Sequence, residues 1–187
     1  MPIHEDKKFE NKSFSDGLYN ETYDYCDFSK CDFSNAKIID CQFNDCTFFD
    51  CNFSMTDLSQ STMNNAKFKN CKILGVKFNL CNDFIFEVAF ENCILDYSSF
   101  EKRKMSKTLF KDSSLKGVDF GETNLKQSKF INCDLTDTIF YNSNIQEVDF
   151  TTAFNYIMDI RQNQMKKARF SKDGLQGLLS HFNIIIE

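Results

Sequence analysis

The sequence of 187 residues has no Trp, one Pro, six Gly and only two His, and it has no run of about 18 apolar residues. The missing apolar run argues against a membrane span, and the start "MPIHEDKK" lacks the apolar stretch of a signal peptide. Because His4 and His181 lie near opposite ends, they support neither a catalytic triad nor a metal cluster. No phosphate-binding glycine loop is present, so we expect no catalytic residue, no cofactor and no metal.

Basic residues are also few, with 22 Lys and Arg against 27 Asp and Glu, a net charge of −5. An acidic chain is a poor ligand for nucleic-acid phosphates, so we expect no direct binding of nucleic acid. The charge is uneven, because residues 1–60 hold 12 acidic and 5 basic residues whereas residues 61–158 hold 12 of each. The simplest interpretation of the acidic N-terminal third is a solvated surface that aids solubility.

The abundant residues are Phe, with 22 copies, and Cys, with nine. Large apolar residues recur at every fifth position from Tyr23 to Phe78 and again from Phe90 to Phe150. The residue two places earlier is usually Cys, Ala, Ser, Thr or Val, and every Cys lies in this small position. Glu21 and Arg103 break the rule. A period of five fits neither a helix nor a flat strand.

This repeat predicts an all-β solenoid. Residues two apart on an extended chain point the same way, so the large and the small residue both face inward and the other three face out. A chain that turns after every such segment forms a β-helix with coils about 4.8 Å apart. From Phe90 onward Phe alternates with Leu, Met or Ile, and four sides would stack like upon like whereas three would not. We therefore favour four sides.

Nine cysteines in a small protein raise the question of disulfides or zinc. Their spacing in fives matches the inward small position and not the C-x2-C pairs of a zinc site. We therefore expect buried, reduced thiols and a cytoplasmic location.

The repeat has two interruptions. Its phase slips by two residues at about 79–89, for which we favour a bulged corner over a functional loop. In "EKRKMSK", residues 101–107, Arg103 falls on an inward small position. A buried unpaired charge is costly, so we expect Arg103 and Lys104 to form an exposed candidate loop.

The ends differ from the middle. Residues 1–22 are out of phase and are predicted to cap the repeat β-helix of residues 23–152, and residues 153–187 are predicted to form a helix and dimerisation tail. Leu175, Leu178, Leu179 and Phe182 follow the spacing of an amphipathic helix, with Ser171 as a candidate N-cap. This apolar tail either covers its own core or pairs with a second copy, and we favour pairing.

The run "CDFSK CDFSN AKIID CQFND CTFFD CNFSM TDLSQ" resembles the pentapeptide repeat family. The resemblance covers residues 21 to about 152 and implies a right-handed quadrilateral β-helix. Within that family, the size and the C-terminal tail resemble the Qnr-type and MfpA-like topoisomerase-protecting proteins. That similarity implies a homodimer joined at the C-terminus, which mimics DNA, binds DNA gyrase or topoisomerase IV and protects them from fluoroquinolones or toxins.

The resemblance also implies two sets of contact residues. The dimer contact would comprise Phe154, Tyr156, Leu175, Leu178, Leu179, Phe182, Ile184, Ile185 and Ile186. The acidic surface facing the partner would comprise Asp24, Asp27, Asp32, Asp40, Asp45, Asp50 and Asp57. The alternative is a structural or scaffold module for another protein partner, since fold does not fix function. An enzyme would need a pocket with convergent polar groups, which a filled solenoid does not provide.

Overall fold

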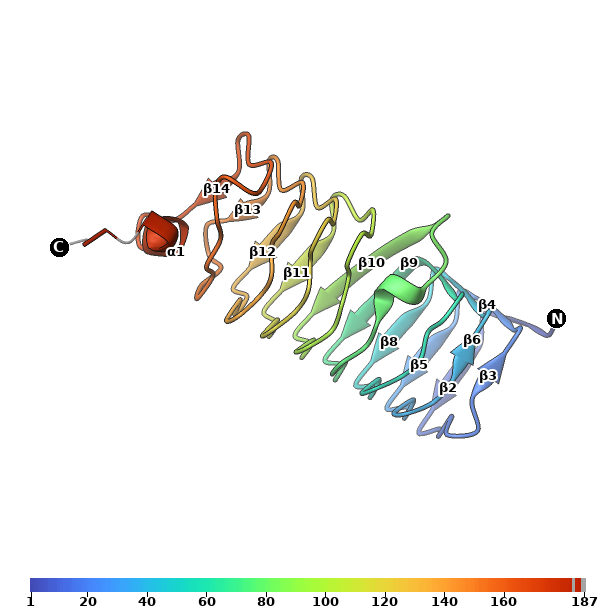
Figure 1. The fold of residues 1–187 in the computed structure, drawn as a ribbon. Helices are drawn as coiled ribbons and strands as arrows, with labels where there is room; N and C mark the ends of the chain where they lie inside the picture. The colour runs from blue at the N-terminus through green and yellow to red at the C-terminus, as the bar shows by residue number, and fades with distance from the viewer. Residues whose placement is uncertain (183, 186–187) are drawn as a thin grey trace.

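The chain forms a rod. The computed structural model describes residues 1–182 and 184–185, and in them the chain winds into a right-handed, four-sided β-helix of about eight turns. The two ends of the chain lie at opposite ends of the rod, with a short helix at the C-terminal end (Figure 1).

Most strands are short because each covers one side of a coil. The elements in chain order are β1 (Ile3–Glu5), β2 (Lys8–Glu10), β3 (Leu18–Tyr19), β4 (Thr22–Asp24), β5 (Asp27–Ser29), β6 (Ile38–Ile39), β7 (Gln42–Asn44), β8 (Thr47–Phe49), β9 (Thr62–Lys69), the 3-10 helix η1 (Phe78–Leu80), β10 (Phe86–Glu91), β11 (Leu109–Lys111), β12 (Lys129–Ile131), β13 (Asp149–Phe150), β14 (Arg169–Phe170), α1 (Leu175–Leu179) and the 3-10 helix η2 (Ser180–Phe182). All strand pairs are parallel, and most join residues that are 20 positions apart.

This register defines four faces, each named here by its column of inward residues. The first face carries Tyr23, Phe43 and Met63, and the second carries the phenylalanines from Phe9 to Phe170. The third face carries Phe14, Phe33, Phe53, Ile73, Leu95, Leu115 and Leu135, and the fourth carries Leu18, Ile38, Leu58, Phe78, Phe100, Phe120 and Phe140.

The core is a set of stacked columns. On the second face neighbouring Phe rings stack with their centroids 4.7–5.4 Å apart, and the column comprises Phe9, Phe28, Phe48, Phe68, Phe90, Phe110, Phe130, Phe150 and Phe170. Rings of the second and fourth faces meet edge to face across the interior, as Phe100 and Phe110 do. The prediction of four sides with like upon like is confirmed.

The inward small position joins successive coils. Thr123 Oγ1 donates to the Phe100 carbonyl at 2.8 Å and Ser143 Oγ to the Phe120 carbonyl at 2.7 Å, in each case 23 residues back. Cysteines do the same more weakly, as Cys46 Sγ does to the Tyr23 carbonyl at 3.3 Å. All nine thiols are buried and none is in a disulfide. Burial raises the pKa of the Cys46, Cys81 and Cys133 thiols to about 12, so they remain neutral.

Residues 1–22 form a coil of the same solenoid in place of the predicted separate cap. β1 pairs with β4 and β2 with β5 in a register of 19, whereas Leu18 pairs with Ile38 in the usual register of 20. The corner between Phe14 and Leu18 is therefore one residue shorter. Gly17 closes this corner with φ +82°, where a Cβ would lie 2.6 Å from the Lys37 carbonyl oxygen.

The solenoid also extends past residue 152, the predicted end of the repeat. Asn144 pairs with Gln164, and Phe150 with Phe170, so one further coil precedes α1. The helix is shorter than predicted, and Ser171 is not its N-cap. Ser171 Oγ instead accepts the Gly174 N–H at 3.1 Å in the turn before α1.

Candidate partner-binding surfaces

The seven aspartates of the predicted acidic surface do not form one patch. Asp24, Asp27, Asp32 and Asp57 lie on the first, second, third and fourth faces respectively, and Asp40, Asp45 and Asp50 lie at corners with φ near +50°. The carboxylates therefore encircle the N-terminal coils. This follows from the repeat, because residues five apart fall on successive faces.

Several of these carboxylates also support the solenoid. Asp32 accepts the Ser34 N–H at 3.0 Å, and its hydrogen bonds with Ser34 lower the pKa of the carboxyl group. Asp45 accepts a hydrogen bond from Asn65 of the next coil at 2.6 Å. Replacing such residues therefore changes local stability as well as charge.

A basic coil follows the acidic ones. Between Asp57 and Asp83 there is no acidic residue, and this stretch holds Lys67, Lys69, Lys72 and Lys77. Lys69 pairs with Glu91 at 3.6 Å. The negative surface of the rod therefore ends after its first three coils.

The two-residue phase slip is a loop at the end of this basic coil. Phe78 and Phe86 lie eight positions apart where five is usual, and Phe86 and Phe90 lie four apart. The chain thus gains three residues at the corner between the fourth and first faces and loses one at the next corner. η1 and residues 82–85 form the enlarged corner, and β10 runs straight through the shortened one.

The prediction that Arg103 turns outward is wrong. The Arg103 side chain is only 2% exposed, and it fills the space under the enlarged corner. Its guanidinium donates to the Cys81 carbonyl at 3.0 Å, to the Asn82 carbonyl at 2.6 Å and to Asp83 Oδ1, and it lies 4.3 Å above the Phe86 ring. The two irregularities of the sequence are therefore one structure, in which the loop supplies acceptors for both terminal nitrogens of the buried guanidinium, whereas its Nε has no partner among the described residues.

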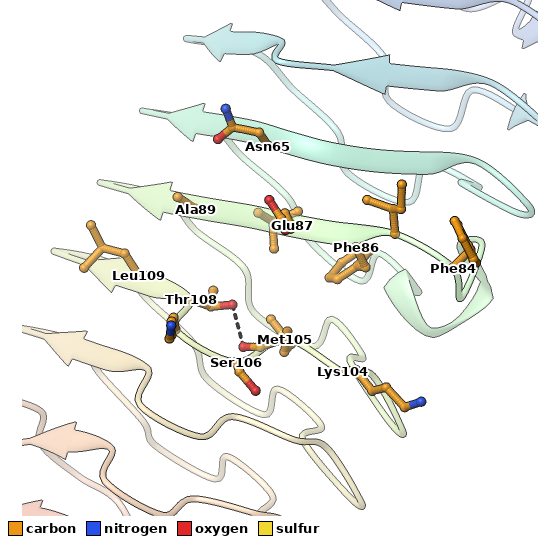
Figure 2. A pocket seen from close by; sticks show the side chains of 13 residues that line it. Asn65, Phe84, Phe86, Glu87, Ala89, Lys104, Met105, Ser106, Thr108 and Leu109 are labelled. Atoms are coloured by element: carbon orange, nitrogen blue, oxygen red, sulfur yellow. Dashed lines mark hydrogen bonds between the residues drawn. The ribbon is translucent and has the colours of Figure 1, made fainter.

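A groove lies beside this structure, with a volume of about 600 Å³. Asn65 and Lys107 occupy the left-handed corner on the coils that flank it, with φ of 53° and 63°, and β10 has no such residue. The edge of the rod at β10 is therefore recessed between the corners at Asn65 and Lys107. Figure 2 shows Phe84 at one end of the groove and Glu87 along its length. Phe84 is 91% exposed. Of the predicted candidate loop, only Lys104 is at the surface, where it lines this groove.

The C-terminal end divides the predicted dimer residues into two groups. Tyr156 and Leu178 are buried within their own chain, which corrects their assignment to the dimer contact. A Cβ on Gly177 would lie 1.9 Å from the Tyr156 carbonyl oxygen, so α1 packs directly on this segment. Leu179 is half-buried and Ile186 lies outside the described residues. The exposed members are Phe154, Leu175, Phe182, Ile184 and Ile185, and they are joined by Ile157 and Ile160, which sequence reasoning missed.

Arg161 holds the last turn in place. Its guanidinium donates two hydrogen bonds to Asp159, at 2.9 and 2.7 Å, its backbone N–H donates a third at 2.9 Å, and the guanidinium lies over the Phe182 ring at 5.3 Å. The Arg161 bonds lower the pKa of Asp159 to about 2.

The described residues contain no group of three or more His, Cys, Asp or Glu side chains that could hold a metal ion. No helix in this part of the chain is long and apolar enough to cross a membrane.

The model of the pentapeptide repeat region matches residues 22–82 and 84–154. The chain belongs to the pentapeptide repeat family. No curated protein sequence matches it. Among solved structures, a trypsin-treated variant of QnrB1, described as a plasmid-mediated fluoroquinolone resistance protein, is 17% identical with a TM-score of 0.74, and the match covers 98% of this chain and 99% of that one.

Two further QnrB1 structures resemble this pentapeptide repeat protein. A second trypsin-treated variant is 17% identical with a TM-score of 0.64, over 99% of this chain and 100% of that one. Full-length QnrB1 is 18% identical with a TM-score of 0.53, over 97% and 100%. At such identity the likeness establishes the fold.

Proposed function

We propose that this pentapeptide repeat protein is a binding protein for a type II topoisomerase, DNA gyrase or topoisomerase IV, and protects it from fluoroquinolones or from toxins that poison it. The observation that carries the proposal is the match to QnrB1 along almost the whole of both chains. A topoisomerase partner would place the protein in the cytoplasm, where its nine buried thiols stay reduced.

The charge of the rod supports a contact of this kind. Residues 1–60 hold 12 acidic and 5 basic residues, and the seven aspartates lie on all four sides. A duplex is likewise negative around its whole circumference, so these coils mimic a short polyanion of about 15 Å, three coils at about 4.8 Å each. The DNA-binding surface of a topoisomerase is the complementary partner for such a segment.

We further propose that two copies join at their C-terminal ends. Five of the predicted contact residues are exposed there together with Ile157 and Ile160, and Ile185 is 88% exposed. A cluster of exposed apolar side chains at one end of a rod is typical of an interface. The dimer would present its acidic coils at both tips. Multi-angle light scattering should give twice the chain mass, and Ile157→Asp should give the monomer.

A supercoiling assay with purified gyrase tests the proposed function. In the presence of ciprofloxacin, added protein should restore supercoiling in a dose-dependent way. The matched variants are Asp27→Asn/Asp40→Asn and Lys72→Gln/Lys77→Gln, which alter the same number of charges in the acidic and basic coils. The first should protect less, and the second should protect as well as the wild type. An assay in which micromolar protein neither inhibits nor protects gyrase or topoisomerase IV would contradict the proposal.

The basic coil favours a second candidate, a scaffold module for another protein. Lys67, Lys69, Lys72 and Lys77 interrupt the resemblance to a polyanion just after the third coil. In that case affinity purification from cells would recover a different protein, and neutralising the acidic coils would leave its binding unchanged.

A further inference from the structure

The groove beside β10 combines an apolar end with unpaired positive charge. The apolar end is lined by Phe84 and Ile85, together with the buried Phe86 and Met105. Phe84 is 91% exposed, and the hydrogen bonds from the buried Arg103 to the Cys81 and Asn82 carbonyls fix the loop that carries it. The ring is therefore positioned at the surface before any partner binds. Such preorganised rings are the usual anchors of protein interfaces.

The lysines of the groove lack carboxylate partners. Within residues 1–182 and 184–185, neither Lys104 nor Lys107 has a carboxylate at ion-pairing distance, whereas nearby Lys102 pairs with Glu101 at 2.8 Å and with Glu122 at 3.7 Å. Each of these unpaired cations offers a contact for a negative side chain of a ligand.

Glu87 lies along the same groove and is exposed. The negative charge of Glu87 would repel the phosphates of a nucleic acid in the groove, and two lysines are too few to offset that repulsion. A polypeptide suits the recess better, because its backbone and side chains offer N–H and O–H donors to Glu87.

We propose that this groove binds a segment of the partner protein that carries an aliphatic or aromatic side chain next to a carboxylate. The apolar side chain would pack against Phe84, and the carboxylate would pair with Lys104 or Lys107. The inference rests on the proposed function for the identity of the partner, a type II topoisomerase. It adds a contact separate from the acidic coils and opposite to them in charge.

The test measures binding of purified gyrase and topoisomerase IV to the full chain by biolayer interferometry. Phe84→Ser should weaken binding at least about tenfold, as loss of an aromatic anchor does. Lys104→Gln/Lys107→Gln should weaken it about tenfold, chiefly by slowing association, and should reduce its salt dependence.

Each variant has a matched control. Tyr97→Ser removes an aromatic side chain that is 75% exposed on another edge of the rod, and Lys72→Gln/Lys77→Gln removes two exposed lysines on the third and fourth faces. Both controls should bind like the wild type. Circular dichroism verifies that all four variants are folded.

Carbodiimide cross-linking supplies a second measurement, because it joins a lysine to a carboxylate only when the two are in contact. Lys104 or Lys107 should be joined to an Asp or Glu of the topoisomerase, and the linked peptide should also hold an aliphatic or aromatic residue. If the wild type binds but both groove variants bind equally well and neither lysine is cross-linked, the groove inference is overturned and the proposed function stands. If the wild type binds neither enzyme, both are overturned.

Discussion

The regular coils and the interrupted coil solve the same packing problem in different ways. In the regular coils a small residue fills the inward position, and where it is Ser, Thr or Cys it can bond to the coil before it, as Thr123 does to the Phe100 carbonyl at 2.8 Å. One coil after the enlarged corner that position holds Arg103, whose guanidinium reaches back to the carbonyls of Cys81 and Asn82. The difference teaches that a large polar residue fits a solenoid core where the neighbouring coil bulges to supply both space and acceptors.

The largest expected effect comes from the aromatic columns. Phe110 is fully buried and stacks on Phe90 at 5.4 Å and Phe130 at 4.7 Å, so Phe110→Ala should lower the free energy of unfolding by about 3–5 kcal/mol. Phe86 in the interrupted coil stacks on no other ring: it meets Phe78 and Phe100 edge to face and has the Arg103 guanidinium 4.3 Å above it, so Phe86→Ala should cost less. Urea denaturation followed by circular dichroism measures both. Equal losses would show that the two kinds of coil pack alike.

The next effect concerns Arg103 itself. Arg103→Ala would leave two loop carbonyls without a donor and open a cavity, so the free energy of unfolding should fall by about 3 kcal/mol. Arg103→Met fills the space without the hydrogen bonds and should recover part of that loss. If Arg103→Thr, which restores the residue type of the regular coils, were as stable as the wild type, the bulged loop would not depend on the guanidinium.

A pH effect follows from the buried thiols. Burial raises the pKa of Cys81 and Cys133 from 9.0 to about 12 in the folded chain, so both ionise earlier when unfolded. The stability they contribute is fully present below pH 9 and is lost as the pH rises toward 12, by about 1.4 kcal/mol per pH unit for each thiol.

Serine does not titrate, so Cys133→Ser and Cys81→Ser should each reduce this slope by the same amount. Urea denaturation at pH 9, 10 and 11 gives the slopes. An unchanged slope for Cys81→Ser alone would mean that the interrupted coil admits water to its core.

The smallest effect is expected at Asp83. Its carboxylate pairs with Arg103, but the Asp83 side chain is 94% exposed. Asp83→Ala should therefore cost less than about 1 kcal/mol, since water screens the pair and the backbone carbonyls keep the guanidinium bonded. Thermal unfolding at low and high salt checks this. A loss as large as that of Arg103→Ala would mean that the ion pair, and not the carbonyls, stabilises the loop.

The periodic part of the fold could be predicted from the sequence because five-residue spacing determines which side chains face inward. The interrupted coil could not, because the acceptors of Arg103 are backbone carbonyls, whose direction depends on the path of the loop. One signal was available: Cys81 and Arg103 lie 22 residues apart, one coil plus the two-residue slip. The two irregularities could therefore have been expected to meet.

The last coil was missed for a different reason. After Phe150 the five-residue pattern breaks at positions 155 and 160, where the buried residues are instead Tyr156 and Met158, and it resumes at Met165. The pairing of Phe150 with Phe170, 20 positions apart, preserves the period of a whole coil. A search at the period of the coil, and not of the repeat, would have found it.

The 20-residue register makes the regular coils interchangeable units. Deleting residues 111–130 would remove one whole coil, keep the inward columns aligned and shorten the rod by about 4.8 Å. The length of the rod can therefore change by duplication or loss of a single coil. The coil that contains Cys81 and Asn82 is not interchangeable, because its removal would leave the buried Arg103 guanidinium without its carbonyl acceptors. Variation in rod length among descendants of this chain is therefore expected on either side of that pair and not across it.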